Sequence, residues 1–129
     1  SHYKKVIFSN YELNDGLFEA YELNNDFNKF KYIGSKFNRK LHNSLQKSTL
    51  VTHINFGYYF NCSLDNALDN CIQLTILVFG SKFNRSLANS LYNCTLLTHL
   101  TFGYYFNQPL ANFIGCLYST NPYKIWLFV

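Results

Sequence analysis

Residues 80–107 read GSKFNRSLANSLYNCTLLTHLTFGYYFN, and they decide the fold because they repeat the stretch at 34–61. The two stretches are identical at 20 of 28 positions. Four Phe-Asn pairs, which begin at Phe37, Phe60, Phe83 and Phe106, follow one another at a constant spacing of 23 residues. A fixed period of about 20 to 50 residues is typical of repeat architectures. The chain is therefore predicted to be a stack of 23-residue coils, duplicated as pairs.

Apolar residues recur at the same places in the coils that begin at Phe37, Phe60 and Phe83. Leucine or isoleucine stands four, eight and seventeen residues after each Phe, and another Phe stands nineteen residues after it. Alternating apolar and polar residues occur near the end of two coils, as Ile54-Asn55-Phe56 and Leu100-Thr101-Phe102, which predicts a short strand with one face buried. A glycine follows each strand, and we expect it to permit a tight turn or a positive φ.

The predicted fold is α/β or mainly β. It is a leucine-rich-repeat-like solenoid of 23-residue coils, with a parallel sheet on one face and short helical turns, 3₁₀ turns or loops on the other. We expect residues 1–33 to form a divergent N-terminal coil or cap, and residues 34–129 to form four repeats in one continuous solenoid domain. The period places Tyr123 and Ile125 in a final strand.

Asparagine also stands in register from coil to coil. One set directly follows each Phe and the other stands six residues after it: Asn38, Asn61, Asn84, Asn107, and Asn43, Asn66, Asn89, Asn112. An asparagine side chain can bond to turn backbone and to an identical amide in the next coil. Both sets are predicted to be structural ladders. The three sequons that begin at Asn61, Asn84 and Asn93 are then accidents of an Asn-rich repeat.

The charge is unevenly distributed along the chain. The net charge is +4, yet five of the seven acidic residues lie in the first 26 positions, and basic residues follow them. This asymmetry fits either a solvated surface or a docking face for an acidic partner. At 48% hydrophobic and 19% aromatic residues, the chain is too apolar to be disordered. It has no run of 18 or more apolar residues, so no membrane span is expected.

The reactive residue types do not form a catalytic or metal-binding motif. The four cysteines make no CxxC pair, and Cys71 and Cys94 share an inward position, which favours buried free thiols. His53 and His99 share an outward position two coils apart, about 10 Å, too far for one metal ion to bridge. No phosphate-binding loop, nucleophile motif or paired carboxylates occur. We therefore expect no enzyme activity, no metal and no cofactor.

The outward residues of the strands form the predicted binding surface. They comprise the alternating strand positions and the tyrosines that follow two of the strands: His53, Asn55, Ile76, Val78, His99, Thr101, Tyr58 and Tyr104. Solenoids commonly bind through such a concave sheet face, and tyrosine is frequent in interfaces.

The pattern at 83–110, Phe-Asn-x-x-Leu…Cys-x-x-Leu-Thr-His-Leu-Thr-Phe-Gly-x-x-Phe-Asn-Gln-Pro-Leu, resembles the FNIP repeat, a relative of the leucine-rich repeat. The resemblance covers about residues 34–129, although only Gln108-Pro109 approaches the Ile-Pro of the family name. It implies a source among giant DNA viruses of amoebae or slime moulds, where several members also carry an F-box. It also implies a cytoplasmic location, either host cytoplasm or virion.

We expect a non-enzymatic protein–protein interaction module that binds a partner through the sheet face. The alternative is a structural protein of a virion or surface that associates end to end through its apolar C-terminal edge, Trp126-Leu127-Phe128-Val129. Nucleic acid is a less favoured partner at a net charge of +4.

Overall fold

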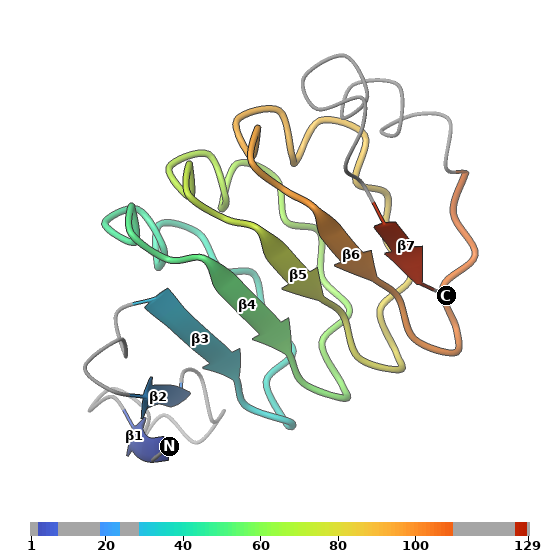
Figure 1. Cartoon of the computed structure of the whole chain (residues 1–129). Coiled ribbons are helices and arrows are strands. Elements are labelled where there is room, and N and C mark those ends of the chain that lie inside the picture. Colours follow the sequence, from blue (N-terminus) through green and yellow to red (C-terminus); the bar gives the residue numbers. More distant parts are fainter. Residues whose placement is uncertain (1–2, 8–18, 24–28, 110–125, 129) are drawn as a thin grey trace.

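The computed structural model describes residues 3–7, 19–23, 29–109 and 126–128 (Figure 1). The strands, in chain order, are β1 (Tyr3–Ile7), β2 (Glu19–Leu23), β3 (Phe30–Ile33), β4 (His53–Phe56), β5 (Ile76–Val78), β6 (His99–Thr101) and β7 (Trp126–Phe128). They form one sheet in which the spatial order is the chain order. The strands β1, β2 and β3 pair antiparallel, and every pairing from β3 to β7 is parallel.

The parallel pairings keep the period of the sequence. His53 lies opposite Ile76, and Ile76 lies opposite His99, so residues one period apart are neighbours in the sheet. The same offset pairs Phe30 with His53, and the parallel sheet therefore already begins within residues 1–33. The prediction of a mainly β fold with a parallel sheet is confirmed.

The segments between the parallel strands, residues 34–52, 57–75 and 79–98, consist largely of consecutive tight turns, and we call them return segments. In the segment 34–52, main-chain N–H groups of Ser44, Gln46 and Ser48 donate to carbonyls three residues earlier, at 2.9–3.0 Å. Such i→i+3 bonds are the 3₁₀ pattern. No α-helix forms in the described part of the chain, so the α/β alternative is wrong there. The polar residues of these segments are better suited to turns than to helix interiors.

The last strand lies four residues later than the sequence period predicts. Leu127, rather than Tyr123, is paired with Leu100, and β7 is Trp126–Phe128. The prediction that Tyr123 is in register is therefore wrong. The last connection is longer than one repeat period, and a period taken from the preceding repeats cannot detect an insertion. Tyr123 and Ile125 themselves lie outside the described residues.

Two columns of stacked phenylalanine rings run through the core. The rings of Phe37, Phe60, Phe83 and Phe106 are nearly parallel, with centroids 5.9–6.1 Å apart between neighbours. A second column comprises Phe56, Phe79 and Phe102, with spacings of 5.2 and 5.7 Å. Leucines four and eight residues after Phe37, Phe60 and Phe83, such as Leu64 and Leu68, are buried in the same core. Each repeat thus covers the apolar face of its neighbour, which no single repeat could bury alone.

The glycine after each strand is required because the neighbouring backbone is close. A Cβ built on Gly80 would lie 2.2 Å from the carbonyl oxygen of Gly57, and one on Gly103 would lie 2.5 Å from that of Gly80. None of these glycines has a left-handed φ; within the described residues, the positive-φ residues other than glycine are His42 and Asp65, on the return segments. Positive φ is therefore not what requires these glycines; close backbone approach between repeats requires them, and the repeat pattern did not predict this.

The asparagines that follow each Phe form a hydrogen-bond ladder. The main-chain N–H of Asn61 donates to Oδ1 of Asn38, Asn84 to Asn61, and Asn107 to Asn84, each at 2.8 Å. Two of the sequons therefore begin at asparagines that the ladder uses. A side chain that accepts from the next repeat ties the turns together.

The second predicted ladder does not join the described repeats. Among the described residues, no hydrogen bond joins Asn43 to Asn66 or Asn66 to Asn89; these three are exposed, and Asn112 lies outside the described residues. The amides that bridge there are Asn70, which donates to the carbonyl of Gln46 (2.8 Å), and Asn93, which donates to that of Asp69 (3.0 Å). Periodic occurrence reveals a shared position, but not which way a side chain turns.

Candidate binding groove on the sheet

The strands alternate between the core and an open face. Ile54, Leu77 and Leu100 are fully buried, and the residues on either side of each point to the other face. That face therefore displays three pairs from three neighbouring strands: His53 and Asn55, Ile76 and Val78, His99 and Thr101. All are half-buried except Asn55, which is exposed. The period of two along each strand places the six together.

A groove of about 680 Å³ lies over the first three parallel strands. Its lining comprises residues of β3, β4 and β5: Phe30, Lys31, Tyr32, His53, Ile54, Asn55, Ile76 and Val78. Four of the predicted surface residues thus line one hollow. His99 and Thr101 are on β6 beside it, and Tyr58 and Tyr104 lie beyond the strand ends, outside it.

Phe30 and Tyr32 line the groove although sequence reasoning did not select them. They stand one repeat period before His53 and Asn55, and the sheet pairs them with those two residues. The period extends to these residues, but one period before Phe37-Asn38 the sequence has Asn14-Asp15, so no Phe-Asn pair marks this repeat. The ring of Phe30 packs against that of His53, with centroids 4.6 Å apart. The groove consequently has an aromatic wall at one end and aliphatic side chains at the other.

The half-buried imidazole of His53 is biased toward its neutral form. Burial lowers the pKa of His53, and the nearby charge of His99 lowers it further. At neutral pH this ring therefore presents a hydrogen-bonding group without a charge.

A threonine orients each of the two histidine rings. The Nδ1 of His53 lies 2.8 Å from Oγ1 of Thr52, and that of His99 lies 2.9 Å from Oγ1 of Thr98. Each threonine hydroxyl also donates to the carbonyl one repeat earlier, at 3.3 and 3.1 Å. Thr75, which precedes Ile76 rather than a histidine, makes the same bond at 3.1 Å.

Because a hydroxyl has a single proton, this shared bond favours Nδ1 of the histidines as the donor to Oγ1. The Nε2 of His53 is then left as a hydrogen-bond acceptor. The groove combines this acceptor and the Asn55 amide with apolar walls, which suits a ligand that brings both apolar and hydrogen-bonding groups.

Lys31 stands at the buried position of its strand, opposite Ile54. It is half-buried, and burial lowers its pKa, an effect that the charge of Cys71 partly offsets. Lysine carries its ammonium group on a long apolar stem, so a half-buried position is tolerated where the core ends.

The buried cysteines are poor nucleophiles. Cys71 and Cys94 are free thiols, and burial raises their pKa values to about 11 and about 12. A thiol reacts as its thiolate, which these positions disfavour. Among the described residues, no group of three His, Cys, Asp or Glu side chains could hold a metal ion. Cys116 lies outside the described residues.

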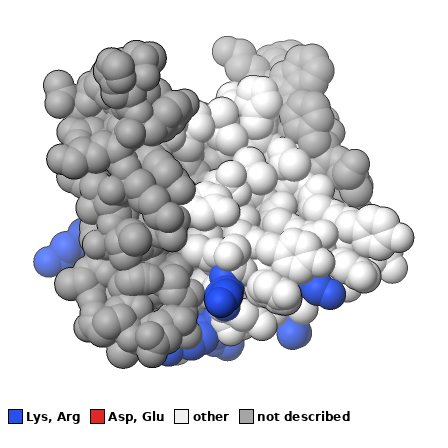
Figure 2. Space-filling model, turned by 90° about the horizontal axis from the view of Figure 1, so that it is seen from below, with Lys and Arg blue, Asp and Glu red and all other residues white. Residues whose placement is uncertain are grey.

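The long described segment, residues 29–109, is strongly basic. It contains eight Lys or Arg residues and only two acidic ones, Asp65 and Asp69. Asp65 is paired with Lys40, with Oδ2 and Nζ 3.2 Å apart. Figure 2 views the protein from the side where the parallel strands end, and its coloured surface shows basic groups and no acidic group. This side therefore favours anionic ligands over cationic ones.

Comparisons with known proteins do not extend these observations. No family model, no curated protein and no solved structure matches the chain significantly. No helix that could span a membrane occurs within the described residues. The fold thus rests on its own geometry: a mainly β chain whose parallel strands recur at one constant offset from β3 to β6.

Proposed function

We propose that this chain is a solenoid of 23-residue coils, similar to FNIP and leucine-rich repeats, that binds a protein partner through its sheet face without catalysing a reaction. The groove over β3, β4 and β5 carries the proposal. It is the site where apolar side chains on the sheet meet hydrogen-bonding groups.

The chemistry of the groove favours a protein over a small polar ligand. Ile76 and Val78 present aliphatic groups on the open face, which a partner's apolar side chain would cover. Tyr32 and Phe30 add aromatic area of the kind that dominates interface energetics. Asn55 and Nε2 of His53 offer hydrogen bonds that fix the orientation of the bound segment. A cytoplasmic partner, in a host cell or a virion, agrees with the FNIP-like pattern.

A pair of matched isoleucine substitutions tests the proposal. Ile76→Glu would place a charge in the groove, whereas Ile72→Glu would place the same charge on an exposed return segment, where Ile72 is 49% exposed. A photo-crosslinking residue at Asn55 would capture the partner from a lysate of the source cells. We expect Ile76→Glu to abolish the crosslinked species and Ile72→Glu to leave it intact. Equal recovery with both variants would refute the sheet-face assignment.

End-to-end self-association is the second candidate. β1 and β7 are the two outer strands of the sheet, and an outer strand offers backbone groups for pairing with another chain. A monomer in light scattering across the accessible protein concentrations would eliminate this candidate. Dimers or longer species that a β7 proline substitution, such as Leu127→Pro, converts to monomers would support it.

A further inference from the structure

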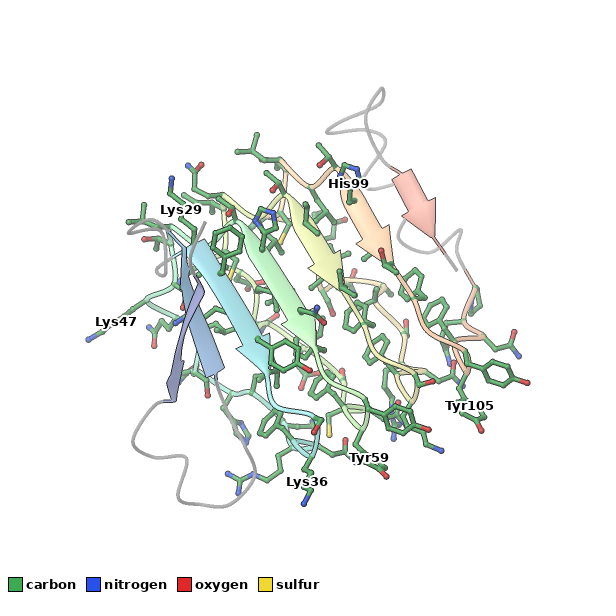
Figure 3. The ribbon with its side chains drawn as sticks, turned by 60° about the horizontal axis from the view of Figure 1, so that its bottom comes forward. Lys29, Lys36, Lys47, Tyr59, His99 and Tyr105 are labelled. Carbon is green, nitrogen blue, oxygen red and sulfur yellow. The ribbon has the colours of Figure 1, made fainter. Side chains whose placement is uncertain are left out.

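A row of alternating lysine and tyrosine residues lies along the edge of the sheet where the parallel strands end. The position just before each repeat's Phe is occupied in turn by Lys36, Tyr59, Lys82 and Tyr105. Figure 3 shows Lys36, Tyr59 and Tyr105 on this edge, at the opposite ends of the strands from Lys29 and His99. The preceding position alternates with the same rhythm, as Ser35, Tyr58, Ser81 and Tyr104. We call these eight residues the Lys/Tyr ridge.

The backbone holds the ridge in a fixed register. The N–H of Tyr59 donates to the carbonyl of Ser35, that of Lys82 to Tyr58, and that of Tyr105 to Ser81, each at 3.1 Å. Three equal bonds between successive repeats mean that the side chains project from evenly spaced anchors. A partner would therefore meet a surface that is already ordered, which reduces the entropy cost of binding.

The tyrosines form two equivalent aromatic pairs. The rings of Tyr58 and Tyr59 meet edge to face with centroids 4.8 Å apart, and those of Tyr104 and Tyr105 do so at 5.0 Å, both at 75°. Their exposed fractions range from 46% for Tyr58 to 85% for Tyr104. The same geometry therefore occurs twice, two repeats apart, with much of each pair open to solvent.

Lys82 lies between the two aromatic pairs. Its Nζ is 4.5 Å from the ring centre of Tyr105 and 5.9 Å from that of Tyr58, within reach of a cation–π interaction with both. The two tyrosines come from the repeats on either side of Lys82. The ammonium group thus lies between the pairs, closer to Tyr105, and the small side chain of Ser81 precedes Lys82 in the ridge. The ridge alternates a charged step with an aromatic one.

The period of this alternation identifies the conformation of a matching ligand. Hydrogen bonds join the backbone of the ridge from repeat to repeat, so neighbouring backbone anchors are about 4.8 Å apart and equivalent anchors recur every two repeats, about 9.6 Å. A polyproline II helix advances about 3.1 Å per residue with three residues per turn, so its equivalent side chains recur every ~9.3 Å. An extended β-strand repeats one face every ~6.7 Å, and an α-helical turn rises ~5.4 Å; neither matches.

We propose that the Lys/Tyr ridge binds a proline-rich acidic peptide segment in the polyproline II conformation. Its carboxylates, three residues apart, would lie against Lys36 and Lys82. Its prolines would pack on the tyrosine pairs, as proline-rich segments do in other aromatic recognition surfaces. The excess of basic residues in the described segment 29–109 supports an acidic ligand, and the ridge itself contains no acid. This surface is separate from the groove and does not depend on the function proposed for it.

Binding of synthetic peptides tests the proposal. The probe is a fluorescent (Glu-Pro-Pro)6 peptide, and the controls are (Glu-Gly-Gly)6, which lacks the conformation, and (Lys-Pro-Pro)6, which lacks the charge. Anisotropy in about 50 mM salt should show binding of the first and at least tenfold weaker binding of both controls. Equal affinity for (Glu-Gly-Gly)6, or no binding of (Glu-Pro-Pro)6, would overturn the proposal. So would tighter binding of oligo-dT, which would make the ridge a nucleic-acid surface.

Variants locate the binding on the protein. Lys82→Glu and Lys36→Glu should each weaken (Glu-Pro-Pro)6 binding about tenfold or more. Lys47→Glu makes the same charge change at an exposed position on a return segment away from the ridge (Figure 3), and it should weaken binding less than twofold. Circular dichroism would verify that each variant is folded. Equal losses in the Lys47 and Lys82 variants would reduce the effect to net charge and refute the ridge. Ile76→Glu in the groove should leave peptide binding unchanged.

Discussion

Replacing Gly80 by alanine tests the stacking of the repeats most directly. The added Cβ would lie 2.2 Å from the carbonyl oxygen of Gly57 and 2.7 Å from its carbonyl carbon. A carbon and an oxygen that are not bonded require about 3.2 Å, so the two backbones must separate by roughly 1 Å. Both contacted atoms are backbone, and no side-chain rotation can relieve the clash.

The structure also indicates what that separation would cost. It would stretch the bond from Lys82 N–H to the carbonyl of Tyr58, now 3.1 Å, which contributes about 1 kcal/mol. It would also loosen the ring stack of Phe56 on Phe79, and misfit of this kind in a packed core costs about 1–3 kcal/mol. Alanine restricts the unfolded chain and recovers at most about 1 kcal/mol. We expect a net loss of about 1–3 kcal/mol.

Urea unfolding followed by circular dichroism would measure this loss. Ser81→Ala, in the same turn, is the matched control, and its unfolding free energy should change by less than about 0.5 kcal/mol. Gly103→Ala, whose Cβ would lie 2.5 Å from the nearest atom, should also destabilise. If Gly80→Ala were as stable as the Ser81 variant, the close backbone approach would not limit the packing of the repeats.

The asparagine ladder, the buried thiols and the groove histidine each give a further prediction. Asn84→Ala should lower the unfolding free energy by about 1–2 kcal/mol because the N–H of Asn107 loses its 2.8 Å acceptor, and Asn84→Asp, which keeps an acceptor, should lose less in the same urea experiment. The buried thiols Cys71 and Cys94 have pKa values raised from 9.0 to about 11 and about 12, so the stability of their neutral forms is complete below pH 9 and is lost as the pH rises toward those values. The urea midpoint should therefore fall above pH 9, and less steeply in Cys94→Ala; an unchanged slope in this variant would show that the thiol is not the cause. For His53, ¹⁵N NMR at neutral pH should show the proton on Nδ1, and a proton on Nε2 would reverse the hydrogen-bond assignment.

The sequence predicted the repeating part of the fold because burial and period coincide there. Every Phe, Leu and Ile position predicted to be in the core of the three central repeats is buried, and the asparagines that directly follow each Phe bond between repeats. The period failed where the chain departs from it. Leu127 pairs with Leu100 through a longer connection, which a pattern learned from other repeats does not anticipate.

Part of the groove lining could also be predicted from the sequence, because it follows from the repeat and from strand alternation. Its aliphatic and histidine lining follows from strand alternation, which sets the face of each side chain. Phe30 and Tyr32 belong to the same columns, but the repeat that contains them lacks the Phe-Asn marker in register. Asn70 and Asn93, rather than Asn43 and Asn66, donate hydrogen bonds to the preceding repeat. Turn geometry decides which asparagines can do so, and the spacing of residues in the sequence does not reveal that geometry.

The core and the surface of this protein have different repeat periods. Phenylalanine stacking has a unit of one repeat, whereas the Lys/Tyr order of the ridge and the His-Ile-His order of the sheet face have a unit of two. Excision of residues 60–82 would join like to like, with Tyr59 beside Tyr105 and His53 beside His99, although the ring stack could close again. The order of surface residues is therefore kept only if the number of repeats changes by an even number, whereas the core packing has no such requirement. Array length should change more safely by two repeats than by one, in evolution as in engineering.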